Sequence, residues 1–328
     1  MVDRSLALGA LPNSCWSVVN WSALAGQKLF LTGATGFVGG WVLATIAKMN
    51  AISETPLYVR ALTRESQGFK RPWLTWVPGD IRNFTDDEHV DLVLHAALPS
   101  TATPPGGEAE LIDIACLGAE RLMKHAVNSG SRRTMVLSSG AVYGSASLPL
   151  SEEATLGPIS ATDTYAWAKR QVEAIARDSS HKDHDILIAR LFTCIGEGYR
   201  LHNHLAHVSL LKGARAGGPL FLRGDGTSIR SYLAGEDLGL WLLTLLSRKG
   251  CDTVNVGSDD AISIRELALL IARCACLDPT TVKFAGETGG ARPYFVPDIT
   301  KARTLYGLET WTPVKTVVER LLRNPTTK

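Results

Sequence analysis

The stretch Thr32-Gly33-Ala34-Thr35-Gly36-Phe37-Val38-Gly39 lies between a short apolar run at 28–32 and a helical pattern at 38–49. Its first glycine permits a tight turn, its second lets a pyrophosphate approach the backbone, and its third lets the helix pack closely on a sheet. The first N–H groups of such a helix, together with its dipole, attract phosphate. A glycine pattern alone also fits a plain turn, but the flanking strand and helix favour a dinucleotide site. We expect this site to include Gly33, Thr35, Gly36, Phe37, Val38 and Gly39.

The rest of the chain repeats the order of strand followed by helix. This alternation predicts a parallel, doubly wound sheet of Rossmann type, in the α/β class. The expected strands are residues 57–62, 74–77, 91–95, 133–138, 185–191 and 253–256, and the expected helices are residues 109–129, 165–177 and 237–247.

The rhythm changes after about residue 194, where the segments become mixed and contain several Gly and Pro. We therefore assign residues 27–193 and 232–257 to a dinucleotide-binding Rossmann domain. A smaller, mixed α/β lobe for the substrate is expected from residues 194–231 and 258–328. Residues 1–26 form an N-terminal extension, which we expect to pack on the domain through Trp16 and Trp21. The alternative, a signal peptide, needs a stronger apolar stretch than residues 5–19 provide.

The composition excludes several classes of protein. The 328 residues include 34 Lys and Arg against 32 Asp and Glu, and this near-balance argues against nucleic-acid binding as the main function. With 45% hydrophobic and 20% charged residues, the chain is typical of a globular protein. No apolar run is long enough for a transmembrane helix, so no membrane partner is expected. The six cysteines are scattered, which favours reduced thiols and a cytoplasmic location.

A tyrosine and a lysine share one helix face in Tyr165-Ala166-Trp167-Ala168-Lys169, because positions i and i+4 are neighbours. Tyrosine has an ordinary pKa of about 10. A nearby ammonium favours the phenolate and lowers that pKa, which suits proton transfer. Ser139 follows a predicted strand and could orient the reacting oxygen toward Tyr165. The Tyr–Lys spacing alone also fits an exposed helix face, but with the glycine turn and the serine it predicts a catalytic site.

The residue near the end of the second strand indicates which dinucleotide is bound. In NAD sites an acidic residue there usually binds the ribose 2′-hydroxyl, whereas an arginine accommodates a 2′-phosphate. Arg64 holds this position. The sequence therefore favours NADP(H) as cofactor, while NAD(H) stays possible because Arg64 would also fit a solvated surface.

These motifs resemble the extended short-chain dehydrogenase/reductase family, the NAD-dependent epimerase/dehydratase group that modifies nucleotide sugars. The resemblance runs from about Gln27 to Asn324. Besides the glycine turn and the Tyr–Lys pair, the matching segments are G-D-I at 79–81, H-A-A at 95–97, S-S-G-A-V-Y-G at 138–144, R-L-F at 190–192, R-G-D-G at 223–226, R-S-Y at 230–232, N-V-G at 255–257 and R-P at 292–293.

The resemblance implies a role for each matching residue. Two residues should flank the adenine, and two should line the cofactor path. Three should form a catalytic triad, whose serine also contacts the substrate and whose tyrosine and lysine also contact the cofactor. Two arginines should hold the sugar-nucleotide diphosphate. Guanidinium suits the last role because it binds phosphate oxygens in a fork. In that order, the residues are Asp80 and Ile81, Ala96 and Ala97, Ser139, Tyr165 and Lys169, and Arg230 and Arg292.

Other substrate contacts are expected at two places. Relatives often carry Asn after R-x-F, near the substrate nucleotide, and this chain has Thr193 there. Ser100 and Thr101 follow the fourth strand, in a loop at the end of the sheet where ligands bind in such folds. We therefore expect sugar contacts from Ser100 and Thr101.

The residues beside the serine indicate the type of reaction. Related 4,6-dehydratases typically carry T-D-E-V-Y and related decarboxylases T-S-E-V-Y, whereas this chain reads Ser139-Gly140-Ala141-Val142-Tyr143. With no carboxylate beside the serine, simple hydride transfer is favoured over elimination or decarboxylation. We expect 4-keto reduction with Tyr165 as general acid. The alternative is a redox-neutral 4-epimerase that retains NAD.

Two further classes fit the sequence less well. Non-catalytic dinucleotide-binding regulators of this fold commonly lose the Tyr–Lys pair, which this chain keeps. His202, His204 and His207 could suggest a metal, but no carboxylate or cysteine joins them, so we expect surface or substrate-facing histidines and no metal site. Relatives often dimerise through the helix that carries the catalytic tyrosine, and a homodimer is the expected assembly.

Overall fold

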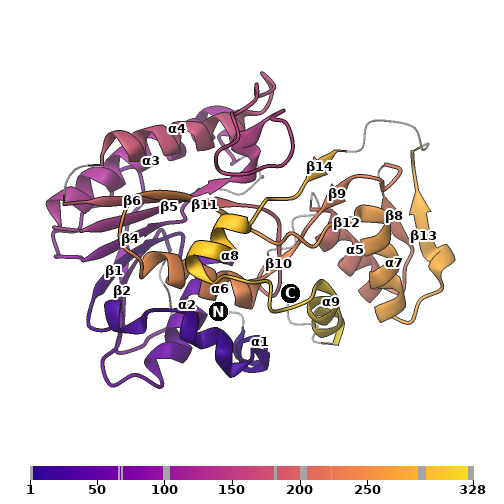
Figure 1. Ribbon diagram of the computed structural model, residues 1–328, viewed down its shortest axis with the longest axis horizontal. Coiled ribbons are helices and arrows are strands. Elements are labelled where there is room, and N and C mark those ends of the chain that lie inside the picture. Colours follow the sequence, from indigo (N-terminus) through magenta and orange to yellow (C-terminus); the bar gives the residue numbers. More distant parts are fainter. Residues whose placement is uncertain are drawn as a thin grey trace.

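Seven apolar strands lie side by side in one parallel sheet (Figure 1). The computed structural model describes residues 3–65, 67, 69–98, 104–180, 183–199, 205–222, 224–286 and 293–323. The central strands are buried on both faces, as expected for a parallel sheet covered by helices. From one edge to the other the strands are β11 (Asp252–Val256), β6 (Asp185–Leu191), β5 (Arg133–Ser139), β4 (Leu92–His95), β1 (Lys28–Thr32), β2 (Tyr58–Thr63) and β3 (Leu74–Pro78).

Helices cover both faces of this sheet, as the sequence predicts. The helices α3 (Gly107–Asn128) and α4 (Thr164–Asp178) lie on one face, and α2 (Phe37–Asn50) and α6 (Gly235–Leu246) lie on the other (Figure 1). On β1, Leu29 and Leu31 belong to the core beneath α2 and α6, whereas Phe30 packs toward α3. The alternating directions of these side chains bury both surfaces of the strand. The doubly wound Rossmann-type fold is thereby confirmed.

The N-terminal extension packs against α2 and α6. It contains α1 (Ser5–Ala10) and two short 3-10 helices, Asn13–Val18 and Trp21–Ala23. Leu8 is buried in the same core as α2, and Trp16 and Trp21 pack on that core. Lys48 on α2 donates a hydrogen bond from Nζ to the Leu8 carbonyl at 2.8 Å, and its Nζ lies 4.5 Å from the centre of the Trp16 ring.

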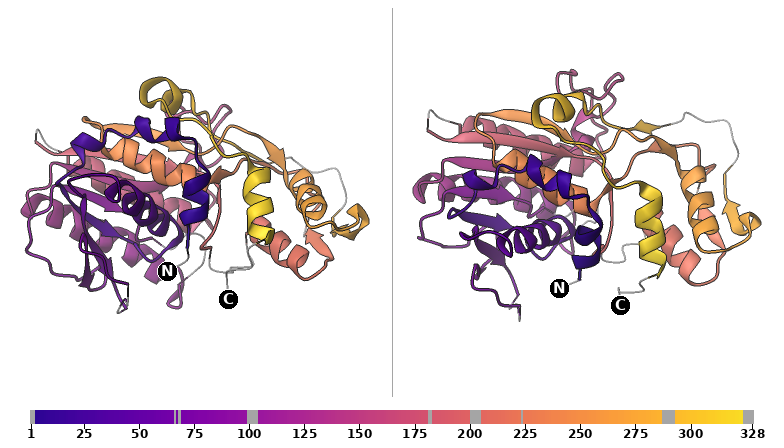
Figure 2. Two further views of the ribbon diagram at one scale, coloured as in Figure 1. Left: turned by 90° about the horizontal axis from the view of Figure 1, so that it is seen from below. Right: turned by 60° about the horizontal axis from the view of Figure 1, so that its bottom comes forward.

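A smaller lobe lies beside the sheet (Figure 1, right; Figure 2). Its apolar centre includes Leu210, Leu267 and Val317. The division into two domains stays a prediction, and Ile299 and Leu308, assigned to this lobe from the sequence, pack in the core under the sheet. The remaining elements are β7 (Cys194–Ile195), α5 (Ala206–Arg215), β8 (Leu220–Leu222), β9 (Ile229–Arg230), β10 (Leu233–Ala234), β12 (Ile262–Ser263), α7 (Ile264–Cys274), β13 (Val282–Phe284), β14 (Tyr294–Phe295), α8 (Thr300–Tyr306) and α9 (Val314–Arg323), with 3-10 helices at Gly140–Tyr143 and Pro279–Thr281.

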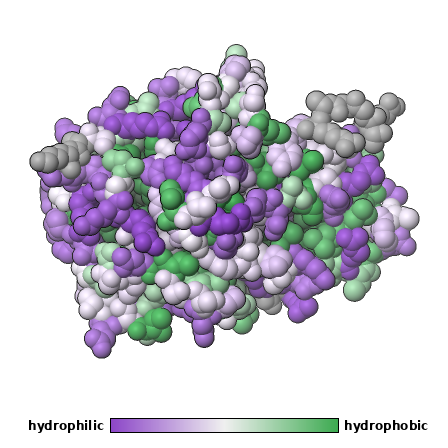
Figure 3. All heavy atoms as spheres, in the orientation of Figure 1, coloured by the Kyte–Doolittle hydropathy of each residue, from purple (hydrophilic) through white to green (hydrophobic). Residues whose placement is uncertain are grey.

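Among the described residues, no helix combines the length and apolarity needed to cross a membrane. Hydrophilic residues cover much of the face in Figure 3, with hydrophobic residues scattered among them. Single exposed apolar residues of this kind are ordinary on globular proteins.

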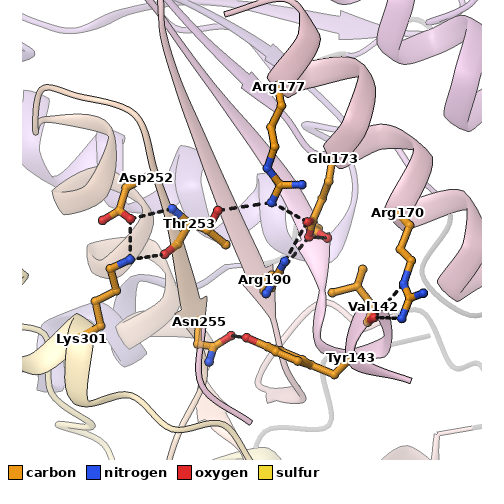
Figure 4. Close-up of polar contacts among 11 residues, drawn as sticks. Val142, Tyr143, Arg170, Glu173, Arg177, Arg190, Asp252, Thr253, Asn255 and Lys301 are labelled. Carbon is orange, nitrogen blue, oxygen red and sulfur yellow. Dashed lines mark hydrogen bonds and ion pairs between the residues drawn. The ribbon is translucent and has the colours of Figure 1, made fainter. Parts of the chain in front are cut away.

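A buried ion cluster fastens α4 to the sheet (Figure 4). The Glu173 carboxylate accepts hydrogen bonds from Ser138 Oγ at 2.5 Å and from Arg190 Nε and Nη2 at 3.0 Å each. Arg177 adds a bond at 2.9 Å from one turn further along α4. Burial alone would raise the pKa of Glu173, but the bonds and charge of Arg190, with Ser138, hold that pKa below its usual value. The cluster therefore keeps α4 at a fixed height over β5 and β6.

The loop after β5 is also fastened by side chains (Figure 4). Arg170 on α4 donates from Nε to the Val142 carbonyl at 2.9 Å. The Tyr143 hydroxyl donates to Asn255 Oδ1 at 2.8 Å, and the Asn255 amide donates to the carbonyl of Leu150 at 2.8 Å. Since this loop begins at Ser139, these bonds fix the backbone that carries the predicted catalytic serine.

We expect Glu173→Ala to lower the free energy of unfolding by about 3–5 kcal/mol, because it leaves the buried Arg190 guanidinium without its counterion. Arg177→Ala is the matched control, since Arg177 is 47% exposed and pairs with the same carboxylate. Its expected cost is below about 1 kcal/mol. Urea unfolding followed by circular dichroism measures both. A loss of less than about 1 kcal/mol for Glu173→Ala would contradict the role given to this ion pair.

Candidate active site

Ser139, Tyr165 and Lys169 meet at the carboxyl end of β5. Asp163 caps α4, accepting a hydrogen bond from the Ala166 amide at 3.0 Å, so Tyr165 lies in the first turn of the helix. Tyr165 and Ser139 are joined by a side-chain hydrogen bond. The Lys169 Nζ donates to the Leu137 carbonyl at 2.7 Å and lies 5.8 Å from the centre of the Tyr165 ring. The three residues predicted as a triad therefore share one site.

Burial sets the proton affinities of this site. It raises the pKa of Tyr165 to about 12, although the bond with Ser139 acts in the opposite direction. Burial also lowers the pKa of Lys169 to about 7, and the charge of Glu173 offsets part of that effect. Tyr165 is consequently a neutral phenol at neutral pH and can donate a proton.

The glycine turn lies next to this triad. Gly33 has φ +70°, a left-handed conformation that favours glycine, and a Cβ there would overlap the Ala96 carbonyl. Thr35 and Gly36 are exposed, and Gly36 is the N-cap residue of α2. Within the described chain no side chain caps this helix, so its first N–H groups are available to an anion. This arrangement fits a dinucleotide pyrophosphate.

Thr32, which was not among the predicted site residues, joins the ends of β1 and β4. The Thr32 Oγ1 accepts hydrogen bonds from the amides of Ala96 at 3.1 Å and Ala97 at 3.2 Å, and it lies 2.9 Å from His95 Nδ1. Burial, together with the charge of Lys169, lowers the pKa of His95 to about 3, so that ring is neutral. In the sequence, the H-A-A segment at 95–97 was the motif that could have identified His95 as part of the site.

Charged residues cluster after β2 and β3. Arg64 is exposed directly after β2, and Asp80 follows β3. Arg82, which the sequence analysis missed, binds the Asp80 carboxylate through Nε at 2.7 Å and Nη2 at 3.0 Å. This pairing, and more weakly the charge of Arg64, lowers the pKa of Asp80. The Ile81 side chain is buried and lies next to Gly118 of α3.

Two phenylalanine rings lie beside the loop that follows Ser139. The rings of Phe192 and Phe295 lie 4.7 Å apart, and a Cβ on Gly140 would come within 2.7 Å of Phe192 and 2.8 Å of Phe295. The Arg230 guanidinium lies 5.6 Å from the Phe295 ring and donates from Nη1 to the Ile229 carbonyl at 2.8 Å. Through these rings, β9 and β14 reach the loop that follows Ser139.

Of the other predicted substrate contacts, Thr193 belongs to the described residues and three do not. The Thr193 carbonyl accepts from the Leu233 amide at 3.0 Å, in the connection between the sheet and the smaller lobe. Ser100, Thr101 and Arg292 lie outside the described residues. The assigned roles of all these residues stay predictions.

A family model described as "NAD dependent epimerase/dehydratase family" matches residues 29–257. Among curated proteins, UDP-glucuronic acid decarboxylase 2 of Arabidopsis thaliana is 26% identical over 304 residues, which are 87% of this chain and 65% of that protein. Low-salt glycan biosynthesis protein Agl12 of Haloferax volcanii is 23% identical and covers 85% of this chain and 92% of its own. The chain spans 61% to 65% of the length of the first curated relatives it matches.

Solved structures share the fold. MoeE5 in complex with UDP-glucuronic acid and NAD has a TM-score of 0.78 at 23% identity, and the match covers 90% of this chain and 98% of that one. UDP-glucuronic acid 4-epimerase from Bacillus cereus, also in complex with UDP-glucuronic acid and NAD, has a TM-score of 0.75 at 22% identity with the same coverage. At these identities the likeness shows the fold.

Proposed function

The chain belongs to the NAD dependent epimerase/dehydratase family, and on that basis we propose that it reduces the 4-keto group of a nucleotide-activated sugar. The family comprises enzymes that act on nucleotide sugars with a nicotinamide cofactor, and the described residues include a complete Ser139–Tyr165–Lys169 triad. Two neighbouring structures contain UDP-glucuronic acid and NAD, and a third contains UDP-glucose and NAD. Those ligands support a nucleotide sugar as the substrate class.

The observation that favours keto reduction is that apolar residues lie beside Ser139. Gly140 and Ala141 occupy the two positions after the serine, and the Phe192 and Phe295 rings fill the space next to Gly140. Elimination of water or of carbon dioxide needs a polar group to move a proton near sugar C5 or C6. Such a group is missing from these two positions, which leaves redox chemistry at C4 as the best-supported reaction.

The residues of the site suit the proton transfer that this reaction needs. Reduced nicotinamide, when bound, supplies the hydride that adds to C4. Ser139 holds the keto oxygen, and Tyr165 donates its phenolic proton to that oxygen as the C–O double bond becomes a single bond. Lys169 then stabilises the resulting phenolate through its positive charge, until a proton from water restores the phenol.

We assign NADP(H) as the preferred cofactor. Arg82 is paired with the Asp80 carboxylate, so the exposed Arg64 is the charge that would attract a ribose 2′-phosphate at the end of β2. Arg230, near Phe295, is proposed to bind the diphosphate.

A 4-epimerase is the second candidate, since the same triad serves it and a Bacillus cereus neighbour is a UDP-glucuronic acid 4-epimerase with NAD. Mass spectrometry of the dinucleotide released from denatured protein separates the two. Stoichiometric NAD carried through purification would favour the epimerase. An empty protein that binds NADPH would favour the reductase.

Tyr165→Phe should lower turnover about 100-fold or more, because the variant has no proton to donate to the keto oxygen. Its dissociation constant for NADPH should stay within about twofold of the parent, since the ring remains. NADPH oxidation with 4-keto nucleotide sugars measures turnover. Tyr58→Phe is the matched control, because Tyr58 is 42% exposed on β2. Parental turnover by Tyr165→Phe would refute the proposed acid.

Arg64→Asp should weaken NADPH binding roughly tenfold or more, because a charge-assisted contact with the 2′-phosphate is replaced by repulsion. NADH, which has no 2′-phosphate, should bind within a few-fold of the parent. Fluorescence titration measures both constants, and Arg323→Asp, on the exposed end of α9, controls for net charge. Equal losses for NADPH and NADH would exclude Arg64 as the discriminating residue.

We also propose a homodimer that pairs α3 and α4 with the same helices of a second chain. These two helices lie together on the outside of the sheet (Figure 1), and Leu117 and Trp167 on them are 49% and 42% exposed. Leu117→Glu with Trp167→Glu should convert a dimer to a monomer in analytical ultracentrifugation. Ile52→Glu, at a site 74% exposed after α2, should leave the dimer intact. A parent that sediments as a monomer contradicts the proposal.

A further inference from the structure

The N-terminal extension inserts one arginine between two parts of the molecule. Arg4 is only 5% exposed, and its guanidinium lies 5.1 Å from the centre of the Trp41 ring on α2. A Cβ on Gly40 would lie 2.7 Å from Arg4 Nη2, and a Cβ on Gly198 would overlap the same atom. Arg4 therefore occupies the space between α2 and residues 196–199, the loop after β7.

The loop at 196–199 ends in a ring that covers the start of the glycine helix. Tyr199 stacks on Phe37 with ring centres 3.8 Å apart and an angle of 21° between the planes. Its hydroxyl donates to the Cys194 carbonyl at 3.1 Å. Burial, with smaller effects of Cys194 and Tyr165, raises the pKa of Tyr199. Phe37 is the first residue of α2, within the proposed cofactor turn.

Ring contacts continue from Tyr199 into the smaller lobe. The His207 ring lies 5.2 Å from Tyr199 and 5.5 Å from Tyr232, edge to face in both pairs. His207 is 2% exposed, so of the two expectations, a surface or a substrate-facing histidine, the first is wrong for this residue, and burial lowers its pKa to about 4. Phe37, Tyr199, His207 and Tyr232 thus connect α2 with α5 and the strand region before β10.

An ion cluster holds the other side of the same loop. Glu197 accepts from Arg320 Nε of α9 at 2.6 Å, and Arg320 Nη1 also donates to Glu236 of α6 at 2.7 Å. The Glu197 charge offsets part of the effect by which burial lowers the pKa of Arg4 to about 10. The loop is consequently held by Arg4 from the extension and by Arg320 from the C-terminal helix.

We propose that Arg4 is a positioning residue of the active site, which holds the loop at 196–199 so that Tyr199 stays stacked on Phe37 and the dinucleotide site keeps its shape. The family match begins at residue 29, so this makes a segment outside the matched region a working part of the site. The inference rests on the dinucleotide binding of the proposed function and does not depend on the sugar or the reaction.

The test measures NADPH and NADH dissociation constants of full-length variants by fluorescence titration, without sugar substrate, alongside melting temperatures. Arg4→Met keeps the apolar stem and removes the guanidinium, and Tyr199→Leu removes the stacked ring. Each should weaken dinucleotide binding about tenfold, and the double variant should be little worse than either single one, because both act through one contact. Arg4→Lys and Tyr199→Phe should restore most of the affinity.

Lys48→Met is the matched control, because it removes another bond between the extension and α2 without touching the loop. It should lower the melting temperature and leave both dissociation constants within about twofold of the parent. If Arg4→Met behaves like this control, Arg4 is merely structural and the proposal is overturned. Losses that multiply in the double variant would show that Arg4 does not act through Tyr199. If Arg4→Met fails to fold, Arg4→Lys and the Tyr199 variants decide by the same criteria.

These outcomes are separable from those of the proposed reaction. A parent chain that binds a dinucleotide but turns over no nucleotide sugar contradicts the reaction alone, and the Arg4 comparison still gives a result. A parent chain that binds neither NADPH nor NADH overturns the role of Arg4 as well.

Discussion

The buried amino group of Lys169 is the constraint on which the rest of the site depends. With only 6% exposure this group would lose its charge more readily still, but Nζ bonds to the Leu137 carbonyl and Glu173 lies one turn further along α4, so its pKa stays at about 7. Glu173 in turn needs Arg190 on β6. Tyr165, Lys169 and Glu173 therefore form one stripe at four-residue spacing, and this stripe sets the height and rotation of α4 over the sheet. The position of the proposed catalytic phenol follows from that register.

Residues from near both ends of the described chain meet at the loop at 196–199. Arg4 from the extension and Arg320 from α9 both hold the loop that carries Tyr199, whose ring rests on the first residue of the glycine helix. The cofactor turn is consequently enclosed by segments more than 300 residues apart in sequence. Long-range packing of this kind gives an enzyme a preorganised site, because few side chains must be ordered when ligands bind.

Local patterns were sufficient to predict the strands and helices of the sheet, the glycine turn and the Ser139–Tyr165–Lys169 constellation, because each depends on neighbours in sequence. The same patterns could not predict Arg4, Tyr199 or the pairing of Arg82 with Asp80, since these contacts arise only when distant elements meet. The burial of His207 could not be predicted for the same reason, because its neighbours in space, the rings of Tyr199 and Tyr232, come from other segments. The extension, described from the sequence as packing on the surface, contributes a buried arginine.

The central claim, hydride transfer to C4 of a nucleotide sugar, is tested most directly by isotope transfer. NADPH deuterated at the transferable position is incubated with UDP- and dTDP-linked 4-keto sugars, and the products are examined by nuclear magnetic resonance and mass spectrometry. The account predicts one deuterium at C4 for each NADPH oxidised. Unlabelled products formed without NADPH oxidation, or products that have lost water or carbon dioxide, would contradict it.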